Sequence, residues 1–366
     1  MDGKALSLKI KEELKKEIEE NNLTPSLTVI QIGDNKASEV YIRNKKKACL
    51  EVGINFDWIK FSDTISEDVV INEIKRLNDD INVNGILVQL PLPAGFNTSK
   101  IINSISPLKD VDGLTYENVG NLVLEQECLV SCTPLGVITM LEYYNVDLKG
   151  KNVCIVGRSN LVGKPLIQLF LQKDATVSVC HSKSYDIKEY TKKADILVVA
   201  VGHPNLITKD MVKEDAIVID VGINKEGNSL MGDVCFEEVS KKASLITPVP
   251  GGIGPMTVVS LLKNIVKAYK LQRWFMKTSF DDIFIDSYPK LDLHGEIRDS
   301  ARVLIKEFIY DNYVLKNKKV LIVHGVGEGI LKDEVKNVLK NNKYVEDFHI
   351  NGFNIGCTVV YLKDKK

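Results

Sequence analysis

Apolar positions in the first 270 residues of the chain follow two regular patterns. Short, nearly continuous apolar runs are separated by longer segments in which apolar residues recur with helical spacing. Buried parallel strands give such runs, and the helices that connect them give such spacing. The pattern therefore predicts an α/β fold built on parallel sheets. The strand-like runs cover residues 27–30, 85–90, 153–156, 176–179, 196–200 and 216–219, and the clearest helical segments cover residues 6–20, 36–51 and 256–270.

The regular spacing of apolar residues ends after Lys270. Residues 274–288 contain aromatic residues and aspartates without a clean period, which is typical of a linker. The rest of the chain has the pattern strand, helix, strand, helix, strand, strand. We therefore expect a linker over residues 271–289 and a small α/β domain over residues 290–366.

The composition narrows the class of protein. The 366 residues are 44% hydrophobic and 27% charged, as in soluble globular proteins, and suffice for two or three domains. The formal net charge of -1 gives no overall attraction to nucleic acid or to a membrane surface. No apolar run is long enough to cross a bilayer, and the N-terminus lacks the apolar region of a signal peptide. The seven scattered cysteines include no Cys-x-x-Cys pair, so we expect reduced thiols and a cytoplasmic protein.

Residues 248–255 form an unusually dense group of prolines and glycines. Three prolines and three glycines lie here, between an apolar run and the helical segment 256–270. At this density they exclude a helix or a central strand. Prolines fix the backbone, and glycines let it approach a flat ligand closely. We expect a functional loop, and the alternative is a purely structural turn.

The strand predicted at 153–156 runs into a turn with a glycine at each side. Gly157 follows the strand and Gly163 opens the next helical segment, where a phosphate can approach a helix N-terminus. The spacing is longer than in the standard dinucleotide motif, and Ser159 replaces its second glycine. Alone, this turn is a weak indication of a dinucleotide site.

The end of the following strand, residues 180–183, strengthens this indication. It contains no aspartate or glutamate that could accept a hydrogen bond from a ribose 2′-hydroxyl. Arg158 in the turn, together with Ser182 and Lys183, would suit a 2′-phosphate through charge-assisted hydrogen bonds. These residues favour NADP over NAD, and the alternative is that Arg158 is a solvated loop residue.

Four polar residues are candidates for the chemistry. Tyr41 and Lys45 are four residues apart on a predicted helix, so their side chains point the same way. Gln89 closes an apolar strand, and Asp112 lies in a loop, as expected at the carboxyl edge of a parallel sheet. An aromatic ring can stack on a flat ligand, a lysine can move protons, and a carboxylate can accept N–H groups of a heterocycle. The alternative for residues 38–47 is a basic, solvated helix face.

Several motifs occur together in one order along the chain. They are residues 41–45 (Tyr-Ile-x-x-Lys), 85–93, 109–113, 132–134, 157–165, 219–224 and 246–257. With them, the first three-quarters of the chain resembles the bifunctional methylenetetrahydrofolate dehydrogenase/methenyltetrahydrofolate cyclohydrolase family.

The resemblance implies a two-step folate chemistry. With NADP, 5,10-methylenetetrahydrofolate is oxidised to 5,10-methenyltetrahydrofolate, which is then hydrolysed to 10-formyltetrahydrofolate for uses such as purine biosynthesis. The implied architecture is a folate-binding lobe (1–122, completed by helix 256–270) and a Rossmann-type lobe (123–252), which flank a cleft, usually in a homodimer. Hydride transfer mainly requires positioning, whereas hydrolysis requires proton transfer. The sequence shows no metal-binding cluster, and this chemistry needs none.

The resemblance also implies roles for individual residues. Lys45 would be the general acid/base, and Gln89 would form a hydrogen bond with it. Tyr41 would stack on the folate, and Asp112 would hold its pterin. The implied substrate contacts are Tyr41, Gln89, Leu90, Pro91, Asp112, Pro250, Gly251 and Gly252. The implied NADP contacts are Gly157, Arg158, Ser159, Gly163, Ser182 and Ile223.

The C-terminal unit resembles the Smr (small MutS-related) domain over residues 290–362. The motif at 291–295 (Leu-Asp-Leu-His-Gly) and a short glycine loop at 325–329 carry the resemblance. Some members of that family nick DNA or cleave RNA, but 14 Lys/Arg against 12 Asp/Glu in residues 286–366 is a weak charge for a nucleic-acid surface. The alternative is an interaction module for a protein. The implied site comprises Asp292, His294, Gly325, Gly327 and Gly329.

Two other functions fit parts of the sequence. The first is a nucleic-acid-binding protein or nuclease whose front part is an inactive folate-enzyme scaffold. The complete set of tyrosine, lysine, glutamine and aspartate argues against it. The second is another NADP-dependent dehydrogenase, such as one acting on a hydroxy acid. It would not account for the tyrosine–lysine helix together with the proline-glycine loop.

Overall fold

The structure is a computed structural model that describes residues 1–227, 229–282, 288–325, 329–350 and 356–364. The chain forms two compact units, Met1–Leu271 and Gln272–Lys366. All strands of the two main sheets in the first unit are parallel, which confirms the predicted α/β class. No described helix is long and apolar enough to span a membrane.

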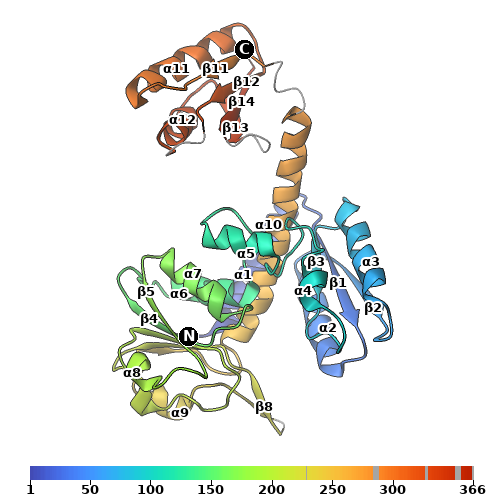
Figure 1. Ribbon diagram of the computed structural model, residues 1–366, viewed down its shortest axis with the longest axis vertical. Helices are drawn as coiled ribbons and strands as arrows, with labels where there is room; N and C mark the ends of the chain where they lie inside the picture. Colours follow the sequence, from blue (N-terminus) through green and yellow to red (C-terminus); the bar gives the residue numbers. More distant parts are fainter. Residues whose placement is uncertain (228, 283–287, 326–328, 351–355, 365–366) are drawn as a thin grey trace. The chain divides into compact units, whose positions relative to one another are not determined.

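The first lobe of the first unit is a three-stranded parallel sheet with its connecting helices (Figure 1). Its elements are α1 (Gly3–Glu20), β1 (Ser26–Ile32), α2 (Lys36–Glu51), β2 (Asn55–Phe61), α3 (Glu67–Asp79), β3 (Gly85–Val88), α4 (Thr98–Ile102) and α5 (Tyr116–Val123). The strand order is β2-β1-β3. Helix α2 has the predicted bounds, because the side chain of Asn35 accepts a hydrogen bond from Ser38 N and Gly53 follows with a positive φ.

The second lobe is a five-stranded parallel sheet of Rossmann type. Its elements are α6 (Cys132–Tyr143), β4 (Asn152–Val156), α7 (Gly163–Leu171), β5 (Thr176–Cys180), α8 (Lys188–Thr191), β6 (Ile196–Val199), η1 (Lys209–Met211), β7 (Ile217–Asp220), a hairpin of β8 (Asn224–Glu226) and β9 (Ser229–Met231), α9 (Phe236–Val239) and β10 (Leu245–Ile246). The strand order is β10-β7-β6-β4-β5. The chain adds β5 on one side of β4 and then β6, β7 and β10 on the other side, so the order of connection switches sides at β4. Such a switch point leaves a crevice at the carboxyl ends of the strands, where α/β proteins bind ligands.

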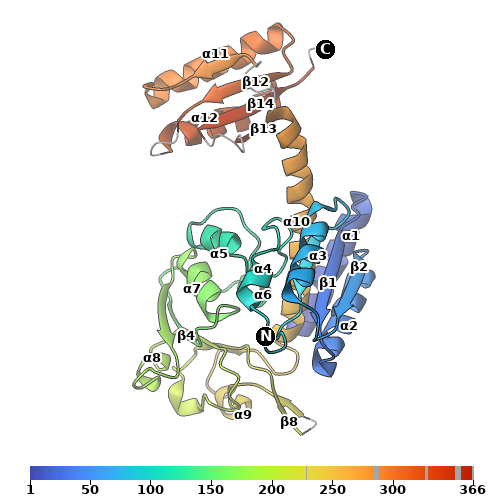
Figure 2. The same ribbon diagram turned by 45° about the vertical axis from the view of Figure 1, so that its right-hand side comes forward.

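Helix α10 (Ile253–Asp282) joins the core of the two lobes. In Figures 1 and 2 its first half runs between the lobe of β1 and the lobe of β4. Leu262 and Ile265 of this helix are fully buried, in one apolar cluster with Leu27 of the first sheet and Ile155 of the second. This shared core supports the cleft between the two lobes.

Two predictions about this region were wrong. Residues 253–255 were expected in a loop, but they form the first turn of α10. Pro255 fits there because the first N–H groups of a helix have no partner within it. The segment 271–282, expected to be part of a linker, continues α10. It contains no glycine or proline, so nothing in its backbone chemistry ends the helix, although its apolar residues lack a period.

The second unit contains a small mixed sheet with two helices. Its elements are β11 (Lys290–Asp292), α11 (Arg298–Val314), β12 (Lys319–Val323), α12 (Ile330–Lys340), β13 (Val345–Ile350) and β14 (Cys357–Leu362). The strand order is β11-β12-β14-β13, in which the β11–β12 pair is parallel and the other two pairs are antiparallel. The predicted order of strands and helices is confirmed. Leu293, Ile305 and Val360 are fully buried in a core of this unit's own.

Candidate active site

A cavity of about 650 Å³ lies between the two lobes of the first unit. The four residues singled out for chemistry, Tyr41, Lys45, Gln89 and Asp112, all line it. The first lobe also contributes Asn44, Leu87, Val88 and Leu90, the second lobe Ser131, Cys132, Thr133, Leu161, Val162, Val221 and Ile223, and α10 Ile253, Gly254, Pro255, Thr257, Val258 and Leu261. The cavity is therefore mainly apolar, with a few polar groups, as is usual for a site that binds a flat organic molecule.

Lys45 and Gln89 form the central polar pair of the cavity. Nζ of Lys45 on α2 donates a hydrogen bond to Oε1 of Gln89, which directly follows β3, at 3.0 Å. Nε2 of Gln89 in turn donates to the carbonyl of Leu90 at 2.7 Å. Because the glutamine amide is fixed from its nitrogen side, its oxygen faces the ammonium group. This geometry holds a proton donor at a defined place in the cavity.

Tyr41 lies one helical turn before Lys45 on the same face of α2. Its side chain is 53% exposed although it lines the cavity. A large aromatic ring that packs this little inside the protein offers its face to a ligand. The alternative interpretation of this helix, a basic solvated face, holds for Lys46 and Lys47, which are exposed and do not line the cavity.

The motif at residues 109–113 divides into structural and cavity-facing residues. Lys109 is buried and donates to the carbonyls of Leu77 and Asp80, at the C-terminal end of α3. Asp110 is buried and accepts hydrogen bonds from Thr115 N and from the side chain of Asn118. Burial raises the pKa of Asp110, and these hydrogen bonds oppose the rise. The neighbouring Asp112 is the carboxylate of this motif that faces the cavity.

Asn264 of α10 is a supporting residue that the sequence did not reveal. It is buried, and Nδ2 donates to the carbonyls of Val111 and Val130 at 2.8 and 2.7 Å. The thiol of Cys132 also donates to Val111 O, and burial raises the pKa of this thiol well above its ordinary value. One helix thereby fixes the backbone beside Asp112 and the segment that enters α6. No local pattern marks Asn264, because its partners are far away in the sequence.

Two threonines form a polar contact across the cavity wall. Oγ1 of Thr133 on α6 lies 3.0 Å from Oγ1 of Thr257 on α10. Both side chains line the cavity. A hydroxyl pair of this kind can accept and donate hydrogen bonds, so it suits an amide or a ring nitrogen of a ligand.

The turn after β4 is shaped for close approach of backbone and ligand. The backbone N–H of Gly157 donates to Cys180 O, and Gly157 has a φ of 133°, which favours glycine. A Cβ on Gly163 would lie 2.3 Å from the carbonyl oxygen of Gly157, so the start of α7 requires glycine here. Oγ of Ser159 accepts a hydrogen bond from Val162 N inside the turn. The two glycines thus bring the N-terminus of α7 against the end of β4.

Arg158 and Ser182 are exposed at the carboxyl ends of β4 and β5. Within the part of the chain that the structure describes, no carboxylate pairs with Arg158. An unpaired guanidinium beside a glycine turn and a serine hydroxyl fits a phosphate group. Ile223, the remaining residue expected at a nucleotide, lines the cavity.

The proline-glycine loop has a packing role as well as a cavity role. The carbonyl of Gly251 accepts a hydrogen bond from Lys4 N, and a Cβ on Gly3 would lie 1.9 Å from Gly252 O. The start of α1 therefore packs directly on this loop. Residues 253–255 line the cavity, whereas the expected substrate contacts Pro91, Pro250, Gly251 and Gly252 lie outside its lining.

In the second unit, three of the five expected residues, Asp292, His294 and Gly325, lie close together in the fold. Asp292 accepts a hydrogen bond from the backbone N–H of His294 at 3.0 Å and lies 2.6 Å from its Nδ1. A Cβ on Gly325 would lie 3.0 Å from Nε2 of His294. Gly329 caps the N-terminus of α12 with a positive φ. Gly327 lies outside the described residues.

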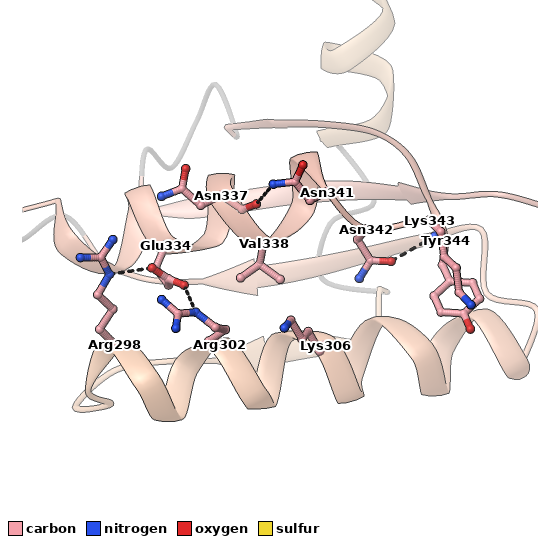
Figure 3. A pocket seen from close by; sticks show the side chains of 10 residues that line it. All are labelled: Arg298, Arg302, Lys306, Glu334, Asn337, Val338, Asn341, Asn342, Lys343 and Tyr344. Atoms are coloured by element: carbon pink, nitrogen blue, oxygen red, sulfur yellow. Dashed lines mark hydrogen bonds and ion pairs between the residues drawn. The ribbon is translucent and has the colours of Figure 1, made fainter.

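A second cavity of about 510 Å³ lies between α11 and α12 (Figure 3). Glu334 of α12 is almost completely buried, and its two oxygens accept hydrogen bonds from Nε of Arg298 and Nε of Arg302, each at 2.6 Å. Lys306 lies one turn further along α11. The carboxylate thus holds both arginines in place and ties the two helices together.

Three family descriptions match the chain. The catalytic domain of tetrahydrofolate dehydrogenase/cyclohydrolase matches residues 1–112, and its NAD(P)-binding domain matches residues 131–273. The Smr domain matches residues 291–363. Together these segments contain every residue that the sequence indicated for a site.

The chain is similar to bifunctional FolD proteins. It is 52% identical over 277 residues to the bifunctional protein FolD of a Nitratiruptor species, which covers 75% of this chain and 98% of the relative. The crystal structure of the bifunctional enzyme FolD, methylenetetrahydrofolate dehydrogenase/cyclohydrolase, from Campylobacter jejuni is 50% identical, with a TM-score of 0.73 and coverage of 74% and 98%. The Trypanosoma brucei FolD, complexed with NADP cofactor and inhibitor, is 35% identical, with a TM-score of 0.71 and coverage of 74% and 97%.

Proposed function

Since the chain belongs to the tetrahydrofolate dehydrogenase/cyclohydrolase family and carries an Smr domain, we propose that the cavity containing Lys45 and Gln89 serves both reactions of this family. The protein is an NADP-dependent methylenetetrahydrofolate dehydrogenase and methenyltetrahydrofolate cyclohydrolase. It oxidises 5,10-methylenetetrahydrofolate and hydrolyses the methenyl product to 10-formyltetrahydrofolate. The assignment of steps to individual residues is our proposal.

Tyr41 and Asp112 bind and orient the folate. The exposed ring of Tyr41 stacks on the flat part of the substrate, and the carboxylate of Asp112 accepts hydrogen bonds from N–H groups of the pterin. Both residues lie on the wall that also carries Lys45. The hydrogen bonds of Asn264 support this placement, because they fix the peptide next to Asp112.

The second lobe holds NADP. The N-terminus of α7 and the turn at Gly157 receive the pyrophosphate, and Arg158 with Ser182 binds the 2′-phosphate. When bound, the cofactor accepts a hydride from the methylene carbon of the substrate. The cavity contributes by holding the two carbons at reacting distance. No charged side chain has to change protonation state in this step.

Lys45 is the proton carrier of the hydrolysis. Water loses one proton as it attacks the methenyl carbon. As the ring opens, the new hydroxyl group loses the second proton and the ring nitrogen gains one, so one proton is released overall. The amine of Lys45 can accept and donate these protons, because it faces the cavity and can exchange protons with the attacking water. Gln89 positions Nζ through the 3.0 Å hydrogen bond without adding a charge.

The single observation that carries this proposal is the Lys45–Gln89 pair, in one cavity with Tyr41 and Asp112. The direct test follows the absorbance of methenyltetrahydrofolate in two assays of the full chain. The first starts from 5,10-methylenetetrahydrofolate with NADP⁺ or NAD⁺, and the second starts from methenyltetrahydrofolate without nucleotide. We expect formation with NADP⁺ and decay in the second assay. A protein inactive in both would contradict the proposal.

Three further properties are part of the proposal. We infer a homodimer from the resemblance to the family, which light scattering of the purified chain tests directly. All seven cysteines are free thiols in the structure, which supports a location in the reducing cytoplasm. The product 10-formyltetrahydrofolate would supply one-carbon units to purine biosynthesis.

The C-terminal Smr domain is proposed to be an accessory domain. Its core is separate from that of the folate enzyme, and all residues assigned to folate and NADP lie in the first unit. The arrangement of Asp292, His294 and Gly325 favours a second function, weak binding of nucleic acid at this end of its sheet. Loss of salt-sensitive binding to oligonucleotides in a His294→Ala variant of the full chain tests this possibility.

A further inference from the structure

Two buried aspartates lie at the carboxyl edge of the second sheet. Asp220 ends β7 and is 3% exposed, and Asp233 follows the β8–β9 hairpin and is 0% exposed. Ionised carboxylates are rarely buried unless every oxygen is satisfied by hydrogen bonds. Their partners therefore show what the pair holds in place.

Asp220 ties its own strand end to the segment of Asp233. Oδ1 accepts hydrogen bonds from Gly222 N and Asp233 N, both at 3.0 Å, and Oδ2 accepts one from Val234 N at 2.9 Å. All three donors are backbone N–H groups. Asp220 thus fixes the position of the main chain that carries Asp233.

Asp233 reaches across to two other loops. Oδ2 accepts hydrogen bonds from Val201 N and Gly202 N, after β6, at 2.7 and 2.9 Å. Oδ1 accepts one from Nδ2 of Asn224 at 2.8 Å. From its place after the β8–β9 hairpin, this carboxylate therefore connects the loop that follows β6 with the segment that follows β7.

Two glycines leave room for these carboxylates. A Cβ on Gly222 would lie 2.2 Å from Oδ1 of Asp233, and a Cβ on Gly232 would lie 1.8 Å from Oδ2 of Asp220. Each aspartate therefore packs against a glycine that lies within two residues of the other aspartate. This reciprocal fit explains both glycines by close approach rather than by a positive φ, since neither has one.

The segment held in this way forms part of the cavity wall. Val221 and Ile223 line the cavity, and they alternate with Gly222 and Asn224, which the two aspartates hold. Ile223 is 48% exposed, so packing of its own side chain contributes little to its position. The hydrogen bonds on either side of Ile223 must therefore set where this wall stands.

We propose that Asp233, fixed by Asp220, is a positioning residue that sets the cofactor wall of the cleft at Val221–Ile223 and the adjoining Val201–Gly202 turn. This inference rests on the proposed function. Asp233 serves NADP binding and hydride transfer, which need this wall at a defined distance. It does not serve the hydrolysis, because Lys45, Gln89 and Asp112 lie on the wall of the other lobe.

An exchange of partners between residues 224 and 233 tests the proposal with the net charge of the pair preserved. Asn224→Asp alone brings a second carboxylate against Asp233, so we expect the Kd for NADPH to rise about tenfold. Addition of Asp233→Asn should restore binding, because the new amide can donate to the carboxylate introduced at position 224 while its oxygen still accepts from Val201 N and Gly202 N. NADPH fluorescence on the full chain measures the Kd values. Absence of rescue would overturn the proposal.

Asp233→Ala separates a positioning role from a merely structural one. We expect dehydrogenase kcat/KM to fall about tenfold or more, with cyclohydrolase activity within about threefold of wild type. Hydrogen exchange of the amides of Val201 and Gly202 should accelerate in the variant without any ligand. Asp195→Ala is the matched control, because Asp195 accepts from Asn152 N at the opposite edge of the same sheet. Equal loss of both activities in a folded Asp233→Ala protein would overturn the proposal, whereas an inactive wild type would contradict the proposed function instead.

Discussion

Nζ of Lys45 lies 3.0 Å from Oε1 of Gln89, and this contact joins α2 to the end of β3 inside the cleft. The two residues are 44 positions apart in the sequence and belong to the same lobe. The lysine therefore enters the cavity from the same lobe as Asp112, and the second lobe supplies the opposite wall. The predictions below follow from this separation of the cavity into a wall with Lys45 and an opposite wall from the second lobe.

Replacement of Arg158 by alanine should change the preference for the cofactor. The guanidinium is exposed at the turn after β4 and has no carboxylate partner among the described residues. Loss of a charge-assisted hydrogen bond to the 2′-phosphate should raise KM for NADP⁺ by about tenfold or more. KM for NAD⁺, which lacks that phosphate, should change little. Initial rates with both cofactors measure this, and equal effects would contradict the assigned role.

Asn264→Leu should impair folate binding and stability together. It leaves the carbonyls of Val111 and Val130 without their amide donor in a buried place, at a cost of about 2 kcal/mol or more. We expect a higher KM for the folate, because the peptide next to Asp112 loses its support. Ser260→Ala, also on α10 and buried, is the control, because Oγ of Ser260 has no hydrogen-bond partner among the described residues. Denaturant unfolding and steady-state kinetics should separate the two variants.

A chain truncated after Ser279 should keep both folate activities. The family match to the NAD(P)-binding domain ends at residue 273, and the first unit ends at Leu271. The truncation removes the Smr domain and leaves the core shared by the two lobes intact. Turnover numbers of the purified truncated and full chains are compared at equal concentration. Loss of dehydrogenase activity in a folded truncated protein would show that the Smr domain is needed for the chemistry.

The stability that the Glu334 ion pairs give to the contact between α11 and α12 should depend on pH. Hydrogen bonds from Arg302 and Arg298 lower the pKa of Glu334 to about 2, below the value of about 4.3 in an unfolded chain. A lowered pKa of an acid stabilises the folded state above the unfolded value, and the gain is lost as the pH falls through the folded value. The stability difference between wild type and Glu334→Gln should therefore be complete above about pH 5 and shrink between about pH 4.3 and 2.

Hydrogen exchange of α12 in the full chain measures this difference, with each pair of proteins compared at the same pH. Glu307→Gln is the control, because Glu307 is an exposed carboxylate on α11. A difference between wild type and Glu334→Gln that stays constant down to about pH 2 would contradict the role of the ion pairs.

Much of the fold could be predicted because its signals are local. The bounds of α2 follow from the Asn35 cap and the glycine after the helix, and the buried strands follow from continuous apolar runs. The helix beyond residue 270 could not be predicted in this way, because its residues favour a helix without a periodic apolar face. The first turn of α10, which contains Pro255, was also not predicted. Proline disrupts the interior of a helix but fits its first turn, so its presence did not exclude a helix start.

The site could be predicted only where its residues stand at strand ends, in the loops that follow strands, or at helical spacing. Tyr41, Lys45, Gln89 and Asp112 all satisfy that condition. Asn264 lies inside a helix, and Asp233 follows a short strand that the apolar pattern did not reveal. Each acts by connecting segments that are distant in the sequence and close only in the fold. Supporting residues of this kind become visible when their hydrogen-bond partners are known.

The central claim is that one cleft separates proton transfer from hydride transfer, with Lys45 needed for the first. The most direct measurement compares both activities of Lys45→Met with those of wild type and of Lys46→Met, which changes a neighbour on the same helix that does not line the cavity. We expect Lys45→Met to lose cyclohydrolase activity and to retain part of its dehydrogenase activity, because hydride transfer needs mainly geometry. Equal loss of both activities in a folded Lys45→Met protein that still binds folate would contradict the account.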